Sequence, residues 1–265
     1  MVVFTDLDGT LLDYRTYSTE LVAPLVARLN RAGVPVVFCS SKTRGEQEVY
    51  RRRLGIDAPF IVEDGGAIFI EPGYFPFAYD YHRLVDGYQV IELGMSYGEI
   101  RRILEQVRQK HNLAFTGFGD MDATQIAAVT GLDLESARRA QKRDYEETLC
   151  LSGTEPEISF ILNHIETAGL RWAKGTRFYG VMGNNDKGMA TRALAKLFRR
   201  KLGGIKTIGI GDSLNDVPML AEVDFPVLVQ KPGGNWQEVE LPKLNRVAGI
   251  GPEGWVRAIK ELAWE

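Results

Sequence analysis

Two aspartates, Asp6 and Asp8, stand two residues apart where the apolar run of residues 2–4 ends. Two carboxylates at this spacing repel each other unless positive charge lies between them. A second acidic stretch, "GDSLND", includes Asp212 and directly follows another apolar run. Carboxylate and carbonyl oxygens are the ligands that Mg²⁺ prefers. We therefore expect Mg²⁺ to be bound by the carboxylates of Asp6 and Asp212 and by the backbone carbonyl of Asp8.

Two more polar clusters stand beside apolar runs, "CSSKT" at residues 39–43 and "NNDKG" at residues 184–188. Each of the four clusters also has a purely structural interpretation, as a turn, a helix start, a surface loop or an Asx turn. Ligands of open parallel sheets bind at the carboxyl ends of the strands. Four clusters in this order therefore favour a single converging site.

The elements that must position these clusters begin as an alternation of strands and helices. This order predicts an α/β fold with a parallel, Rossmann-like sheet. Glu46 follows Thr43 in a capping-box spacing, which predicts where a helix begins. The predicted strands are residues 2–4, 34–39 and 60–62, and the predicted helices are residues 18–30 and 43–54, with Ser18 and Thr43 as N-caps and Gly33 and Gly55 as stops.

After Ile70 the sequence "EPGYFPFAYDYHRLVDGY" is rich in proline, glycine and aromatic residues, which is typical of a connector. Mixed strand and helix patterns follow, and then the parallel pattern returns with a helix over residues 187–202 and the strand-like run "TIGIGD". We predict a core of residues 1–80 and 183–265, interrupted by an inserted α+β cap of residues 81–182.

Composition argues against a general nucleic-acid-binding or membrane-surface protein. The chain is 45% hydrophobic and 25% charged, with a formal net charge of -3, which gives no general attraction to nucleic acid or to an anionic membrane. No leader segment and no membrane span is expected from the pattern. Cys39 and Cys150 form no paired spacing, so a reducing, cytoplasmic location is expected.

The four clusters together resemble the motifs of the haloacid dehalogenase superfamily of phosphotransferases. Asp6 to Thr10 match its first motif, Ser40 its hydroxyl motif, Lys187 its lysine motif and residues 211–216 its acidic motif. An insertion between the hydroxyl and lysine motifs resembles the C2-type cap of the sugar-phosphatase branch.

A narrower resemblance is to the mannosyl-3-phosphoglycerate phosphatase family. It rests on the stretches "CSSKTRGE", "VEDGGAIF", "TGFGDM", "KRDYEE" and "GTRFYGVMGNNDKG". Asp64 and Tyr179 depart from that pattern, because many relatives carry asparagine and histidine there.

The resemblance implies roles that elementary chemistry supports. Asp6 would attack phosphorus and form an aspartyl-phosphate, while Asp8 would act as general acid and then as general base. Lys187 would place positive charge beside the nucleophile, and Ser40 would donate a hydrogen bond to a phosphoryl oxygen. Ser40 and the neighbouring Ser41 remain alternatives for this hydroxyl.

Backbone amides after the aspartate pair, at Gly9 and Thr10, would donate to phosphoryl oxygens. Asp216 would orient metal-bound water or Lys187, a role compatible with capping the following helix. Ser213 and Asn215 are expected beside it around the metal.

Substrate choice is expected in the cap and at its border. Guanidinium and ammonium groups would pair with a carboxylate such as that of glycerate, and the alternative for each is a solvated surface charge. Turn residues would line a sugar pocket, and the alternative for each is a plain structural turn. The candidates for the carboxylate are Lys42, Arg143 and Arg177, and those for the sugar are Gly117, Gly119 and Asp120.

The expected function is Mg²⁺-dependent hydrolysis of a phosphorylated glycoside, with mannosyl-3-phosphoglycerate as the leading substrate and mannosylglycerate as the product. Glucosyl-3-phosphoglycerate or sucrose phosphate is the alternative substrate. A phosphomutase uses the same four motifs, and a catalytically silent sugar-phosphate sensor is a third hypothesis. The oligomeric state does not follow from the sequence.

Overall fold

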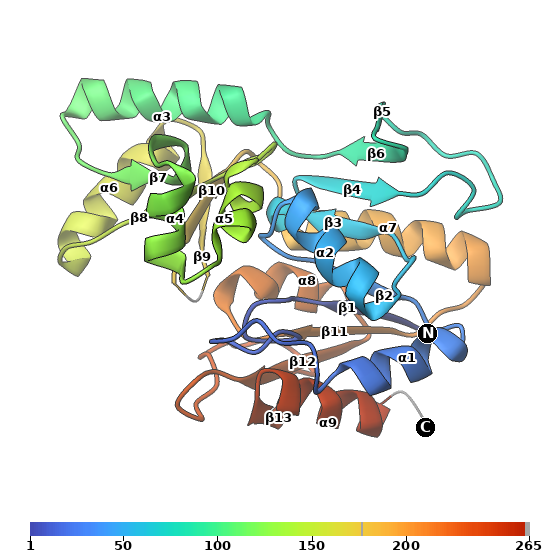
Figure 1. Cartoon of the computed structure of the whole chain (residues 1–265). Coiled ribbons are helices and arrows are strands. Elements are labelled where there is room, and N and C mark those ends of the chain that lie inside the picture. The colour runs from blue at the N-terminus through green and yellow to red at the C-terminus, as the bar shows by residue number, and fades with distance from the viewer. Residues whose placement is uncertain (176, 263–265) are drawn as a thin grey trace.

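The computed structural model describes residues 1–175 and 177–262. A five-stranded parallel sheet forms its centre, in the order β13-β12-β11-β1-β2 (Figure 1). Strand β1 lies between β11 and β2, so the residues that follow these three strands share one edge of the sheet. The strands are β1 (Val2–Thr5), β2 (Val36–Phe38), β11 (Thr207–Gly211), β12 (Phe225–Gln230) and β13 (Asn245–Ile250).

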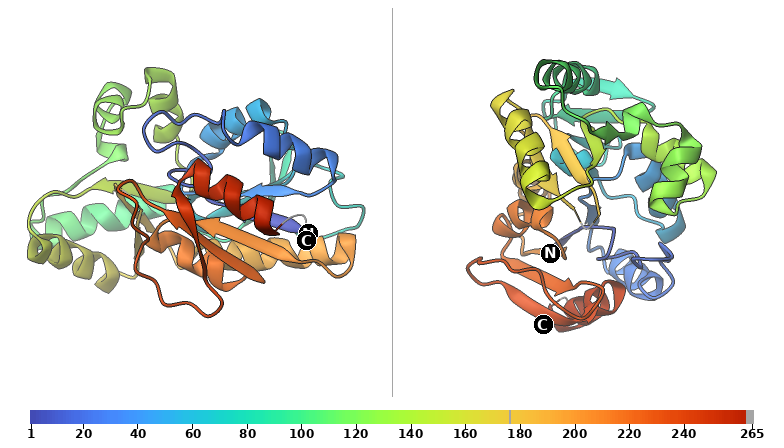
Figure 2. Two further views of the ribbon diagram at one scale, coloured as in Figure 1. Left: turned by 90° about the horizontal axis from the view of Figure 1, so that it is seen from below. Right: turned by 90° about the vertical axis from the view of Figure 1, so that its left-hand side faces the viewer.

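Helices cover both faces of this sheet, as expected for an α/β fold (Figure 2). One face carries α1 (Ala23–Arg31), α2 (Arg44–Leu54) and α9 (Pro252–Leu262), and the other carries α7 (Lys187–Leu202) and α8 (Val217–Ala221). The parallel-sheet prediction is confirmed.

Local capping explains where α2 begins, whereas α1 starts without a side-chain cap. Thr43 and Glu46 form the predicted capping box at the start of α2, and Gly55 ends the helix at φ 63°. Helix α1 begins five residues after Ser18, at Ala23, with a proline in its first turn. The Ser18 hydroxyl instead accepts a hydrogen bond from the Glu20 N–H (3.2 Å), because the chain turns here before the helix starts.

A second, antiparallel sheet, in the order β3-β4-β6-β5, lies beyond the β2 edge of the parallel one, to which a bridge between Cys39 and Ile61 links it. Its strands are β3 (Phe60–Val62), β4 (Ala67–Ile70), β6 (Tyr88–Glu92) and β5 (Arg83–Val85). The sequence placed residues 81–92 in the insertion, whereas β6 pairs with β4 and Val90 is fully buried in the main core. Backbone pairing and burial therefore tie this hairpin to the core side of the molecule.

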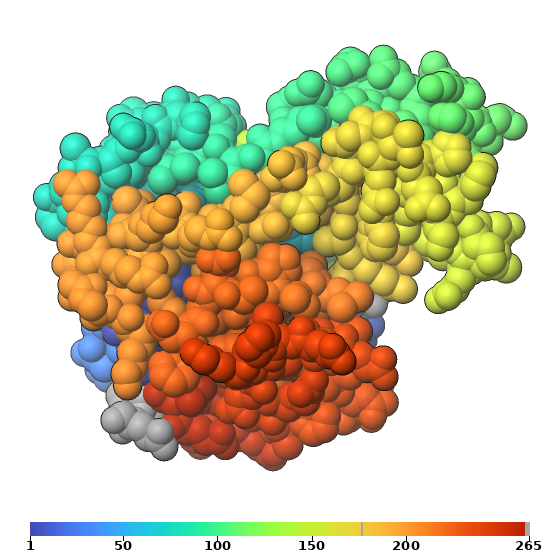
Figure 3. Space-filling view, turned by 180° about the vertical axis from the view of Figure 1, so that it is seen from behind, coloured from blue at the N-terminus to red at the C-terminus, as the bar shows by residue number. Residues whose placement is uncertain are grey.

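A third sheet, with strand order β7-β8-β10-β9, forms a separate lobe, and its α+β character agrees with the expectation (Figure 3). Helices α3 (Tyr97–His111) and α6 (Glu155–Thr167) pack on one face of it, while α4 (Ala123–Thr130) and α5 (Leu134–Gln141) form a smaller cluster. The strands are β7 (Thr116–Gly117), β8 (Glu146–Cys150), β9 (Arg171–Lys174) and β10 (Tyr179–Met182). Below, residues 95–182 are called the cap lobe.

Helix α4 was not predicted from the sequence. It is a short segment of eight residues, and its start is fixed by Asp122, which accepts hydrogen bonds from the N–H groups of Thr124 and Gln125. Its buried Ile126 packs with Ala137 and Ala140 of α5.

Among the described residues, no helix is both long enough and apolar enough to cross a membrane. Cys39 and Cys150 are both free thiols.

Candidate active site

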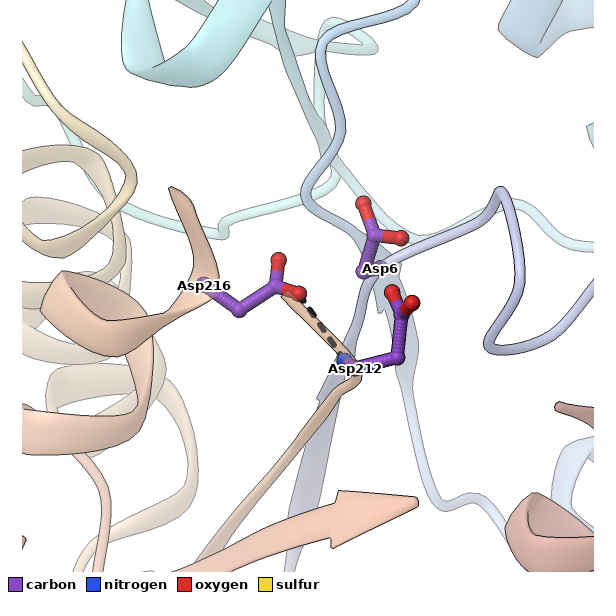
Figure 4. Close-up of side chains that lie close together, drawn as sticks. All are labelled: Asp6, Asp212 and Asp216. Atoms are coloured by element: carbon purple, nitrogen blue, oxygen red, sulfur yellow. Dashed lines mark hydrogen bonds between the residues drawn. The ribbon is translucent and has the colours of Figure 1, made fainter. Parts of the chain in front are cut away.

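Three buried carboxylates meet at the carboxyl edge of the parallel sheet (Figure 4). Asp6 follows β1, Asp212 follows β11, and Asp216 belongs to the 3-10 turn Leu214–Asp216. One oxygen from each of the three lies within 4.8 Å of the others. This arrangement offers several hard oxygen ligands in one place, as a divalent cation requires.

Lys187 is the first residue of α7, and its fully buried side chain contacts this cluster. Its Nζ is 2.6 Å from Asp6 Oδ1 and 2.6 Å from Asp216 Oδ1, and 3.6 Å from Asp64 Oδ1. Burial alone would lower the pKa of Lys187, but the three carboxylates outweigh it and raise that pKa well above its usual range. The lysine is therefore a permanent cation beside Asp6.

Asp216 holds its neighbours in place. Its second carboxylate oxygen accepts the backbone N–H groups of Asp212 and Ser213, both at 3.0 Å. Asp216 thus fixes the loop that carries Asp212 and orients the Lys187 ammonium at the same time.

The charge balance of the cluster fits a divalent cation. Asp6, Asp64, Asp212 and Asp216 are buried, whereas Lys187 is the one cation paired with them among the described residues. Burial chiefly raises the pKa of Asp6 well above its usual range and that of Asp212 to about 7. A bound cation would favour the ionised form of both carboxylates, so these residues suit the metal that the sequence implied.

Asp8 lies at the border between this cluster and the open cleft. Its Oδ2 forms an ion pair with Lys42 (3.0 Å), and its Oδ1 is buried with no hydrogen-bond partner among the described residues. Lys42 also pairs with Glu46 (3.3 Å). The unpartnered oxygen is free to bond a group that enters the cleft.

Gly9 makes the turn after Asp8 possible. It has φ 77°, and a side chain there would lie 3.2 Å from Asp212 Oδ2, so the position favours glycine on both counts. The Thr10 hydroxyl donates to Asp212 Oδ1 (3.3 Å), and the Ser213 hydroxyl donates to Asp212 Oδ2 (3.0 Å). These contacts orient the Asp212 carboxylate.

The two candidate hydroxyls at the end of β2 have different surroundings. Ser40 is buried, and its Oγ accepts the N–H of Lys42 (3.3 Å), whereas Ser41 lines the cleft. Both lie beside Asp6 across the sheet, since β2 pairs directly with β1.

Sequence reasoning treated Asp64 only as a departure from a pattern, yet its carboxylate lies 3.6 Å from Lys187 Nζ. Asp64 has φ 48° in the 3-10 turn Glu63–Gly65, and its carboxylate accepts from Asn215 Nδ2 at 3.2 Å. The signal was "EDGG" at the end of a predicted strand, the same position that singled out the other clusters.

A cleft opens between this cluster and the cap lobe. Its walls are formed by residues that are far apart in the sequence. The core contributes mainly acidic and aromatic side chains, and the cap lobe contributes small, aromatic and charged ones. The core side includes Asp6, Asp8, Tyr14, Tyr17, Ser41 and Lys42, and the cap side includes Phe118, Arg143, Glu146, Thr148, Arg177 and Phe178.

The predicted cationic residues Arg143 and Arg177 differ in the groups to which they already donate hydrogen bonds. The Arg143 guanidinium donates to the Ser41 carbonyl (2.6 Å), to the Glu146 carbonyl (2.8 Å) and to Glu146 Oε1 (2.8 Å), so the protein itself uses it. Arg177 donates to the carbonyls of Thr130 (2.7 Å) and Val129 (2.6 Å) and has no carboxylate partner among the described residues. Of the two arginines, Arg177 is therefore the one whose charge no carboxylate of the described residues offsets.

Gly117, Gly119 and Asp120 lie away from the cleft. Asp120 pairs with Arg101 (2.5 Å) and Arg108 (2.7 Å) of α3 and accepts the N–H of Gly117 (2.9 Å). These hydrogen bonds hold its pKa well below the usual range, although burial acts the other way. The trio fastens β7 to α3, with Phe118 between them as the residue that reaches the cleft.

The comparisons with known proteins agree with this geometry. Residues 3–232 match the haloacid dehalogenase-like hydrolase family. The chain belongs to this family. A glucosyl-3-phosphoglycerate/mannosyl-3-phosphoglycerate phosphatase of Methanococcoides burtonii is 45% identical over 262 residues, covering 98% of this chain and 96% of that protein. A mannosyl-3-phosphoglycerate phosphatase of Pyrococcus furiosus is 38% identical over 228 residues, covering 86% of this chain and 90% of that protein.

Solved structures support the same haloacid dehalogenase-like fold. The HAD subclass IIB sugar phosphatase BT4131 matches with a TM-score of 0.64 at 17% identity, covering 99% of this chain and 98% of that one. A Thermoplasma acidophilum protein matches with a TM-score of 0.69 at 17% identity, covering 98% and 96%. The α/β core with a C2-type cap, expected from the motifs, is thereby confirmed.

Proposed function

We propose that this protein is a Mg²⁺-dependent phosphatase that hydrolyses 3-phosphoglycerate glycosides, with mannosyl-3-phosphoglycerate and glucosyl-3-phosphoglycerate as its substrates. The observation that carries the proposal is the position of Asp6, which lies 2.6 Å from the buried Lys187 ammonium and faces the cleft that the cap lobe covers. The two free cysteines suit the reducing, cytoplasmic location that we also propose.

Asp6, Asp212 and the carbonyl of Asp8 would hold the metal. When bound, the ion neutralises charge on the phosphoryl group and on the attacking carboxylate. The Lys187 ammonium orients Asp6 and opposes the rise in its pKa that burial causes. With the metal bound as well, Asp6 would be ionised, which is the form that attacks phosphorus. Attack forms the Asp6–phosphorus bond and breaks the bond to the glycerate oxygen.

Asp8 transfers a proton in both steps of the reaction, the formation and the hydrolysis of the aspartyl-phosphate. Its carboxyl group donates a proton to the leaving glycerate oxygen and afterwards removes one from the water that attacks the aspartyl-phosphate. Lys42, 3.0 Å from Asp8 Oδ2, positions this side chain at the cleft border. The hydroxyl of Ser41, which lines the cleft, or that of the buried Ser40 would bind a phosphoryl oxygen. The N–H groups of Gly9 and Thr10, expected from the sequence to do the same, instead donate to the carbonyls of Leu12 and Leu7 (both 3.2 Å).

The unpaired charge of Arg177 gives the substrate carboxylate a partner. A guanidinium binds a carboxylate through two parallel hydrogen bonds, which suits the glycerate group. The names of the relatives point to the same chemistry, since both act on phosphoglycerate glycosides.

Phosphate release by the purified protein tests the proposal. The panel contains mannosyl- and glucosyl-3-phosphoglycerate, sucrose phosphate and simple sugar phosphates, each with and without Mg²⁺. We expect the two phosphoglycerate glycosides to be the best substrates and Asp6→Asn to lose turnover by at least about 10⁴-fold while remaining folded. Equal rates across the panel would refute the narrow specificity, and sugar-phosphate isomers without free phosphate would indicate a mutase.

A further inference from the structure

The start of strand β8 carries a buried carboxylate that the proposed chemistry does not use. Glu146 is 1% exposed and lines the cleft opposite Asp6. Its Oε1 accepts from Arg143 Nη2 (2.8 Å), whereas its Oε2 is buried without a hydrogen-bond partner among the described residues. An unsatisfied buried carboxylate oxygen is costly, so a group that enters the cleft and bonds it would gain affinity.

The surroundings fix the direction of this side chain. Residues 146 and 148 of β8 share one face, because side chains alternate along a strand. The neighbouring residues 147 and 149 point to the opposite face, where Glu147 Oε2 bonds Arg101 (2.8 Å) and Leu149 packs with α3 and α6. Glu146 therefore belongs to the face of the cap sheet that looks into the cleft.

Space for the carboxylate is provided by the partner strand. Gly180 of β10 pairs with Thr148, and a side chain at Gly180 would come within 2.8 Å of the Glu146 carboxyl group. The absence of a side chain at residue 180 leaves Glu146 its place and leaves an open floor beside the Thr148 hydroxyl.

The charges nearby define the ligand chemistry. An anionic group at Glu146 would be repelled by this carboxylate and by Asp6, Asp8 and Asp64 across the cleft. An apolar group would leave Oε2 unsatisfied. A neutral hydroxyl satisfies Oε2 without this repulsion, and because a hydroxyl both donates and accepts, it can do so whether Glu146 is ionised or is kept neutral by the burial that raises its pKa.

We propose that Glu146 is a specificity-determining residue whose Oε2 hydrogen-bonds a hydroxyl group of the substrate's sugar, with Arg143 and Gly180 holding it in position. This inference rests on the proposed function, and it assigns the sugar to the floor of the cap sheet and the substrate carboxylate to Arg177.

The test is a ratio of two kcat/KM values, measured for glucosyl-3-phosphoglycerate and for p-nitrophenyl phosphate. The second compound carries the phosphoryl group without a sugar. We expect Glu146→Met to lower the ratio by roughly 10- to 100-fold, and Glu146→Gln to recover part of it, since an amide still bonds a hydroxyl. Glu147→Met, on the opposite face of the same strand, is the matched control and should leave the ratio unchanged.

A second variant leaves the carboxyl chemistry intact. Gly180→Ala should displace the Glu146 side chain and lower the same ratio. If Glu146→Met does not fold, this variant alone tests the role of Glu146. A fall in both kcat/KM values at constant ratio, or an unchanged ratio in Glu146→Met and Gly180→Ala, would overturn the role of Glu146 while leaving the proposed phosphatase intact. A wild-type protein that hydrolyses p-nitrophenyl phosphate but no phosphoglycerate glycoside would refute the proposed substrate, and the sugar contact with it.

Discussion

Asp6 and Asp8 are chemically identical side chains, and we propose different tasks for them because their surroundings differ. Asp6 is buried and bonded to Lys187 at 2.6 Å, whereas Asp8 pairs with Lys42 and keeps one oxygen unpartnered at the border of the cleft. A carboxylate that a permanent cation holds in place suits nucleophilic attack, and one that reaches the leaving group suits proton transfer.

This division predicts how Asp8→Asn responds to the leaving group. We expect the variant to lower kcat for a phosphoglycerate glycoside by about 10²- to 10⁴-fold, because the alkoxide must then leave without a proton. The loss should be much smaller for p-nitrophenyl phosphate, whose leaving group is stable as an anion. Steady-state kinetics with both compounds measures the difference, and equal losses would contradict the general-acid role.

At the scale of elements, the turn Glu63–Gly65 joins the cap lobe to the carboxylate cluster around Lys187. Glu63 accepts the backbone N–H groups of Asp144 (3.0 Å), Tyr145 (2.8 Å) and Glu146 (2.9 Å), while the next residue, Asp64, lies 3.6 Å from Lys187. Both residues have positive φ. One short turn therefore places the start of β8 and contacts the lysine.

The Glu63 carboxyl group predicts a pH-dependent stability. Burial raises its pKa from 4.5 to about 7, although Arg143 and the amide hydrogen bonds oppose this. Because the folded pKa is the higher one, this group stabilises the fold most below pH 4.5, and that contribution is lost as the pH rises to about 7. The full change is about 3 kcal/mol.

Glu63→Gln removes the titrating group and should remove this slope. Urea unfolding of the variant and the wild type between about pH 5 and 7.5 gives the difference in unfolding free energy, which we expect to vary with pH. A difference that stays constant over this range would show that Glu63 keeps the same protonation state in the folded and unfolded chain.

For the whole molecule, the active site depends on two halves of the core that are separated by the cap lobe in sequence. Asp6 and Asp8 directly follow the first strand, and Lys187 and Asp212 come from segments that follow the cap lobe. The four-carboxylate cluster has one lysine paired with it among the described residues, so a cation that binds Asp6 and Asp212 should stabilise the folded chain.

Mg²⁺ should therefore raise the melting temperature. At a concentration of about 100 times Kd, the gain in unfolding free energy is about 2.7 kcal/mol, and EDTA should reverse it. Asp212→Asn should need much more Mg²⁺ for the same shift. Asp120→Asn is the control, because Asp120 pairs with two arginines of α3 away from the metal ligands, and it should respond as the wild type does. Differential scanning calorimetry over a Mg²⁺ series measures the shift, and identical titrations of wild type and Asp212→Asn would contradict the ligand assignment.

Patterns local in sequence determined much of this protein. Apolar runs of strand length, the Thr43–Glu46 capping box and the polar clusters at strand ends predicted the parallel core and brought out Asp6, Asp8, Lys187 and Asp212. These signals are readable because each depends on residues a few positions apart, where backbone geometry fixes what they can reach.

Tertiary structure decided what depends on distant partners. Asp120 had the right chemistry for a sugar contact, but Arg101 and Arg108 engage it away from the cleft. Glu146 lies in the stretch "KRDYEE" but was not singled out, because its unpartnered oxygen and its facing Gly180 depend on the pairing of β8 with β10. Pairing across the sheet also brought residues 83–92 to the core, since strand register and burial depend on contacts that no local pattern contains.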